Sequence, residues 1–89
     1  MLSAKSALTI HMKNLAFDPA SATTTVGETV TFVNDDSVAH NVTGAQMGSS
    51  GDIPAGKSWT YTFKNAGDYH YVCTYHQGMA GEITVTTPK

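Results

Sequence analysis

The chain contains repeated short stretches in which apolar and polar residues alternate, and none shows the three-to-four-residue spacing of a helix. The alternation is clear over residues 8–13, 29–34 and 59–63, and it returns over residues 81–86. Successive side chains of a strand point to opposite faces, so each stretch predicts a strand with one face in a core. The sequence therefore predicts an all-β fold.

Turn-forming residues separate these stretches at the short intervals typical of a sandwich. Residues 44–57 hold four of the eight glycines and predict a long surface loop. Further short strands are expected over residues 21–25, 40–43 and 68–72. Seven or eight strands without a repeat or a linker predict one Greek-key β-sandwich domain covering residues 1–89.

Composition excludes several classes of partner. The formal net charge is −2 and there is no basic run, so nucleic acid is not an expected partner. No stretch is long and apolar enough to span a membrane, and the first residues lack the apolar middle of a secretory signal. A single cysteine allows no internal disulfide, so a bound metal is the remaining way to reinforce so small a domain.

The motif that carries chemistry is Cys73-x2-His76-x2-Met79. Read alone, Cys73 fits an ordinary buried thiol and Met79 an ordinary core residue. Together they offer a thiolate, an imidazole and a weak thioether, which suit an ion that alternates between soft Cu(I) and borderline Cu(II). Zinc is a poorer match because thioether is a poor zinc ligand, and a redox thiol would not need the methionine. The spacing therefore predicts a copper site.

Such a site needs a second imidazole to complete a trigonal plane, and His40 is the expected supplier. It opens the stretch that follows the polar residues 35–37, at the end of the sandwich where the Cys73 strand is expected to finish. Cys73 falls in phase with Tyr71, so its sulfur should point into the core. His11 and His70 fall on the opposite phase of their stretches and are expected to face solvent.

These residues resemble the cupredoxins, the small blue copper proteins. The resemblance rests on His40-Asn41, on the loop CTYHQGM and on residues 80–85, with weaker similarity over residues 17–19 and 26–34. Amicyanins and plastocyanins are the most similar members in the ligand loop. The resemblance implies one type 1 copper per chain, a non-enzymatic role as a one-electron carrier, and a periplasmic or other extracytoplasmic location.

The resemblance also implies roles around the metal. The backbone N–H of Asn41 should donate to the Cys73 sulfur, and its side chain should tie the two ligand segments together. Tyr75 stands where these relatives usually have proline, which restores a backbone N–H close to the sulfur. A redox partner is expected to dock on a monomer near His76, on an uncharged patch that includes Met12, Ala45 and Met47.

Two other functions fit parts of the sequence. A copper carrier or store would use the same Cys, His and Met residues to deliver Cu(I) without moving electrons. An enzyme could pair Cys73 as nucleophile with His76 as base. The enzyme is the weaker alternative because 89 residues offer no evident oxyanion donors or substrate cleft.

Overall fold

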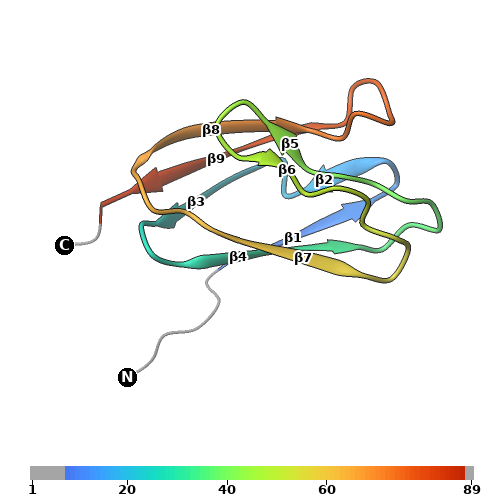
Figure 1. Ribbon diagram of the computed structural model, residues 1–89, viewed down its shortest axis with the longest axis horizontal. Helices are drawn as coiled ribbons and strands as arrows, with labels where there is room; N and C mark the ends of the chain where they lie inside the picture. The colour runs from blue at the N-terminus through green and yellow to red at the C-terminus, as the bar shows by residue number, and fades with distance from the viewer. Residues whose placement is uncertain (1–7, 88–89) are drawn as a thin grey trace.

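The computed structural model describes residues 8–87, which form nine strands in two layers (Figure 1). The strands are β1 (Leu8–Lys13), β2 (Ala16–Asp18), β3 (Ser21–Thr25), β4 (Thr29–Asn34), β5 (Thr43–Gly44), β6 (Gly48–Ser49), β7 (Ser58–Thr62), β8 (Gly67–Val72) and β9 (Ala80–Thr86). One sheet has the order β2-β1-β4-β7 and the other β3-β9-β8-β5-β6. No helix in this range is long and apolar enough to cross a membrane.

The chain passes back and forth between the two sheets, which confirms the predicted Greek-key sandwich. β1 pairs in parallel with β4, and β3 pairs in parallel with β9, whereas the remaining strand pairs are antiparallel. Parallel neighbours require a crossover between the layers, so residues distant in sequence lie side by side. This arrangement brings the β4–β5 and β8–β9 connections to one end of the molecule (Figure 1).

The core follows the predicted alternation. On β4, Val30, Phe32 and Asn34 are buried, while the residues between them are only partly covered. On β8, Tyr69 and Tyr71 are buried and their neighbours are exposed. Since Cys73 continues the same phase, its side chain also lies inside, with 2% of its surface exposed. The expectation that the sulfur points into the core is confirmed.

Three parts of the strand prediction are wrong. The strand expected over residues 40–43 is reduced to β5, and His40 forms an isolated bridge with Ile53 instead. The side chains of His40 and Asn41 are both buried, so this segment does not follow the alternation of a half-buried strand. β2 was missed, and so was β6 inside the expected surface loop 44–57, because two or three residues are too few to show a period.

Tyr71 fills the centre of the core but leaves its hydroxyl without a hydrogen-bond partner among the residues described. Its ring packs edge-on against Phe17 and Phe32. Gly81 lies opposite on β9, where a Cβ atom would come within 2.8 Å of the tyrosine ring. Glycine is therefore required there to admit the ring. Burial raises the pKa of Tyr71, so the hydroxyl stays protonated.

We expect Tyr71→Phe to raise the free energy of unfolding by about 1 kcal/mol, because it removes a buried polar group that has no partner within residues 8–87. The matched control is Tyr69→Phe, which removes a hydroxyl that donates to the Asn65 carbonyl at 2.6 Å. That variant should lose about 1 kcal/mol. Urea denaturation of the metal-free proteins measures both changes, and a Tyr71→Phe variant as destabilised as the control would contradict the prediction.

Candidate metal centre

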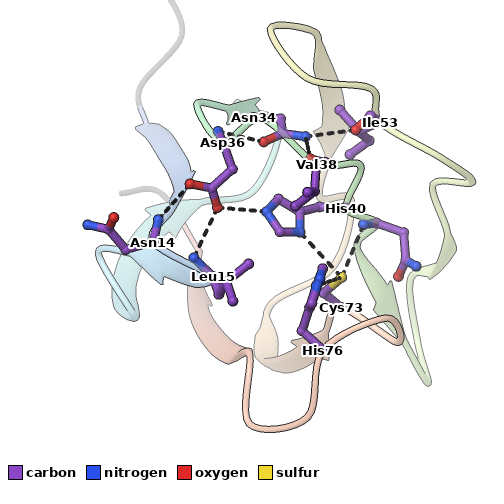
Figure 2. A network of polar contacts seen from close by, with 10 residues as sticks. Asn14, Leu15, Asn34, Asp36, Val38, His40, Ile53, Cys73 and His76 are labelled. Carbon is purple, nitrogen blue, oxygen red and sulfur yellow. Dashed lines mark hydrogen bonds and ion pairs between the residues drawn. The ribbon is translucent and has the colours of Figure 1, made fainter.

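Two imidazole nitrogens and one sulfur converge at the end of the sandwich where β8 finishes (Figure 2). The Nδ1 atoms of His40 and His76 lie 3.7 and 3.6 Å from the Cys73 sulfur. All three donor atoms lie within 4.8 Å of one another. Bonds from a first-row ion to nitrogen and sulfur are about 2.0–2.3 Å, which spaces donors in one plane by about 3.7 Å. The residues therefore fit a single metal ion without rearrangement of the donor set.

His40 is fully buried and is held in place through both its backbone and its imidazole ring. Its backbone exchanges hydrogen bonds with Ile53 at 3.2 and 2.8 Å, which fixes the position of the main chain. Its Nε2 lies 2.8 Å from a carboxylate oxygen of Asp36. An ionised carboxylate accepts hydrogen bonds but cannot donate them, so the hydrogen in this contact lies on Nε2. The lone pair of Nδ1 is then left to bind an ion.

Asp36 connects His40 to the turn between β1 and β2 (Figure 2). Its two carboxylate oxygens accept hydrogen bonds from the backbone N–H groups of Asn14 and Leu15, at 2.8 and 3.0 Å. Both turn residues have positive φ, 56° and 58°, which suits a two-residue hairpin but is strained for leucine. The carboxylate therefore stabilises the turn and orients the histidine at once.

The pKa of Asp36 is held below its ordinary value of 3.8. The largest cause is the hydrogen bond from the Leu15 N–H, and the bonds from His40 and Asn14 add to it. Burial acts in the opposite direction but is outweighed. Asp36 therefore remains a carboxylate at neutral pH. Sequence reasoning missed this residue, although an acid four positions before a ligand histidine was a usable signal.

Asn34 organises the segment between β4 and His40. This buried side chain donates to the carbonyls of Val38 and Ile53 at 2.8 and 2.9 Å, and it accepts from the Asp36 N–H at 2.9 Å. Through these three hydrogen bonds the buried Asn34 holds the backbone on either side of the candidate site, at Asp36, Val38 and Ile53. Buried amides with satisfied hydrogen bonds define one conformation of the backbone, because any other leaves polar groups unpaired.

Asn41 joins the His40 segment to the loop that begins at Cys73. Its backbone N–H points at the Cys73 sulfur over 3.4 Å. Its side-chain amide donates to the Thr74 hydroxyl at 2.9 Å, and its amide oxygen accepts from the Thr74 N–H at 3.2 Å. The two segments are thus bound together at the point where their donor atoms meet.

The remaining residues of the motif lie in the β8–β9 connection. Met79 is buried, and its carbonyl accepts from the Cys73 N–H at 3.0 Å, which closes the loop. His76 is half-buried, with its ring 4.9 Å from that of His40. Tyr75 is half-exposed and its hydroxyl donates to Asp52. The expectation that the Tyr75 N–H reaches the Cys73 sulfur stays a prediction.

The other two histidines lie outside this centre, as the alternation predicted. His11 is partly exposed and pairs with Asp35 at 2.7 Å, and His70 is exposed beside Glu82 at 3.4 Å. The predicted docking patch is wrong in two of its members. Met12 and Met47 are buried, whereas Leu15, Val38 and Tyr75 expose their side chains on the loops that surround the centre.

Comparison with known proteins gives consistent results. The family model for the cupredoxin-like domain matches residues 2–85. The plastocyanin of Scenedesmus fuscus is 39% identical over 85 residues, which cover 80% of this chain and 87% of that protein. The amicyanin of Paracoccus denitrificans is 27% identical, with 92% of this chain and 67% of that protein covered. The chain spans only 51% to 59% of the length of three chloroplastic plastocyanins.

Solved structures agree with these relatives. The Cu(I) form of an amicyanin variant superposes with a TM-score of 0.85 at 27% identity, over 93% of this chain and 85% of that one. A copper-containing nitrite reductase from Thermus scotoductus superposes with a TM-score of 0.86 at 26% identity. That match covers 99% of this chain but 24% of the reductase.

The sandwich, with one thiol and two imidazoles converging at one end, is typical of small β-sandwich proteins that bind a single copper ion. The chain belongs to the cupredoxin-like family, as the match over residues 2–85 shows. The resemblance inferred from the ligand loop is confirmed.

The low pKa of Asp36 predicts a pH-dependent contribution to stability. The folded state binds this proton more weakly than the unfolded chain, so the contribution is complete above the unfolded pKa and disappears as the pH falls through the folded one. We expect Asp36→Asn to lower the free energy of unfolding of the metal-free protein by about 1–2 kcal/mol at neutral pH. The difference from wild type should narrow below pH 3.8.

Urea denaturation at a series of pH values measures this difference. Asp68→Asn is the control, because the hydrogen bond that the Asp68 carboxylate accepts from Thr84, at 3.1 Å, is exposed. Its effect should stay below about 0.5 kcal/mol at all pH values. A cost of Asp36→Asn that is the same in acid as at neutral pH would show that the charge of the carboxylate is unimportant.

Proposed function

We propose that this protein is a one-electron carrier that binds one type 1 copper per chain through His40, Cys73, His76 and Met79. The convergence of the three donor atoms, with His40 Nε2 already engaged by Asp36, supports the proposal most strongly. When bound, copper supplies one-electron chemistry between Cu(I) and Cu(II). We also propose that residues 1–89 form one cupredoxin-like domain.

The chain's own contribution is to hold the donors in place. His40 and Cys73 are buried and braced by Asn34, Asp36 and Asn41, so they keep their positions whatever charge the site carries. The N–H of Asn41 favours an electron-rich sulfur at Cys73. A site that does not rearrange loses little energy to reorganisation, and this is what rapid electron exchange needs.

Electrons would enter and leave near His76, the half-buried donor of the group. The exposed side chains of Leu15, Val38 and Tyr75 belong to the surrounding loops and offer apolar contacts for a redox protein. Transient contacts of this kind bury little area and need no permanent complex. We propose that the protein acts as a monomer in a periplasmic or other extracytoplasmic compartment, as its relatives suggest.

The alternative of a copper carrier or store is less well supported, because delivery favours an open site and three of the four proposed ligands are at most 2% exposed. An enzyme with Cys73 as nucleophile is also disfavoured, since the same burial denies a substrate access to the thiol. The nitrite reductase likeness covers a domain-sized part of a longer chain and by itself assigns no catalysis.

Addition of Cu(II) to the reduced metal-free protein should give an intense blue or green colour, because a thiolate bound to Cu(II) absorbs visible light by charge transfer. Cys73→Ser should abolish the colour. Visible absorption during a copper titration measures both. Cycles of reduction by ascorbate and oxidation by ferricyanide should remove and restore the colour without loss of copper. A colourless complex would contradict a type 1 site, and copper release on each reduction would favour the store.

His40→Ala should weaken copper binding about tenfold or more, since loss of one ligand removes a large part of the coordination energy. His70→Ala and His11→Ala are the matched controls and should leave both affinity and spectrum unchanged. Competition with a copper chelator of known affinity measures the three variants. An effect of His70→Ala equal to that of His40→Ala would show that the wrong imidazole has been assigned.

A further inference from the structure

A side-chain hydrogen bond ties the exposed side of the loop that carries His76 to the rest of the protein. The hydroxyl of Tyr75 donates to the carboxylate of Asp52, which lies 23 residues earlier in the chain. Both residues are exposed, and Tyr75 directly precedes the proposed ligand His76. The contact therefore joins the ligand loop to the segment between β6 and β7.

Asp52 is a firm anchor because of its neighbour. Ile53 is buried, exchanges two backbone hydrogen bonds with His40, and accepts a third from the Asn34 side chain. The Tyr75–Asp52 contact thus connects the loop of one proposed ligand histidine to the backbone that positions the other. It lies on a different segment from the Asn41–Thr74 contacts and completes a second connection across the site.

The site is closed over the sulfur. Cys73 and Met79 are each 2% exposed and His40 is fully buried, whereas His76 is only half-buried. An ion or a reagent can reach the sulfur most easily if the loop with His76 swings outward. Within the loop, the bonds from the His76 N–H to Cys73 and from the Met79 N–H to His76 are long, at 3.4 and 3.3 Å, and offer weak resistance.

We propose that Tyr75 and Asp52 form a latch that holds the His76 loop closed over Cys73 and limits access of copper to the site. The proposal rests on the proposed function in so far as copper is the ion admitted. Opening breaks the phenol–carboxylate hydrogen bond and moves His76 away from the sulfur, while the buried Asn41 contacts hold the start of the loop. Tyr75 and Asp52 are positioning residues and need not touch the ion.

The latch is tested first without copper, through the reactivity of the thiol. In the reduced metal-free protein the Cys73 thiolate attacks an aromatic disulfide reagent, forms a mixed disulfide and releases a coloured thiolate. Because the thiol is buried, the rate reports the population of the open loop. We expect Tyr75→Phe and Asp52→Ala each to accelerate the reaction about three- to tenfold, the effect of one exposed hydrogen bond.

Two control variants remove a tyrosine hydroxyl and an aspartate carboxylate at positions away from the His76 loop. Tyr61→Phe removes a hydroxyl on β7, and Asp68→Ala removes an exposed carboxylate that accepts one hydrogen bond. Both should react at the wild-type rate. The double variant Tyr75→Phe/Asp52→Ala should be no faster than either single variant, because the two residues act through one contact. Additive effects, or unchanged rates in both single variants, would overturn the latch.

The dependence of the rate on urea separates local opening from general destabilisation. Opening of one loop exposes little surface, so the accelerated reaction should change little at low urea, whereas reaction through global unfolding rises steeply. A steep dependence in the Tyr75→Phe and Asp52→Ala variants would overturn the proposal. If either variant proves unfolded by circular dichroism, the other still decides the result.

Copper uptake completes the test. Stopped-flow mixing of Cu(II) with the metal-free protein should show uptake accelerated by the same factor as the thiol reaction, with the final spectrum unchanged. A blue wild-type protein whose variants show unchanged thiol and uptake rates would refute the latch and leave the proposed function intact. A colourless wild-type protein with accelerated thiol reaction in the variants would refute the proposed function but keep the latch.

Discussion

The position of the Cys73 sulfur, buried at the end of β8 beneath the Asn41 N–H, is the constraint on which the rest of the site depends. Beyond the loop that follows Cys73, a further donor reaches this sulfur only if the fold brings another segment to it. The parallel pairs β1–β4 and β3–β9 place the β4–β5 connection over the end of β8. His40, which lies 33 residues before Cys73 in the chain, is thereby brought next to the sulfur. The topology thus assembles the site from segments that have no local contact.

Polar side chains, rather than apolar packing, then fix these segments. Asn34, His40 and Asn41 are buried with their hydrogen bonds satisfied, and Asp36 adds a carboxylate that serves both His40 and the β1–β2 turn. Such a network contributes modestly to stability, because each bond replaces one with water. Its greater effect is on specificity, since any other arrangement of the loops would bury unpaired polar groups. A domain without a disulfide is thereby given one defined conformation at its metal-binding end.

The sequence predicted the parts of this protein that depend on periodicity and spacing. The strands β1 and β4 and the burial of Cys73 follow from alternation, and the ligand motif from the combination of its donors. The contacts of Asp36 with His40 and Leu15 join loops that have no period, so alternation could not reveal them. Alternation also places Met12 in the core rather than on the docking patch, because Met12 shares the phase of Ile10 on β1.

The distribution of these contacts also explains how one loop can be rigid and still admit an ion. The hydrogen bond from the Asn41 N–H to the Cys73 sulfur is buried and those between Asn41 and Thr74 are partly buried, so water replaces them less readily and breaking them costs more. The Tyr75–Asp52 contact is exposed, so both groups are solvated when it breaks and opening there costs less. The positive φ of Gly78, 85°, gives the far side of the loop a backbone conformation that other residues rarely adopt. The loop should therefore open at its exposed side around His76, while Cys73 and His40 keep the geometry that electron transfer requires.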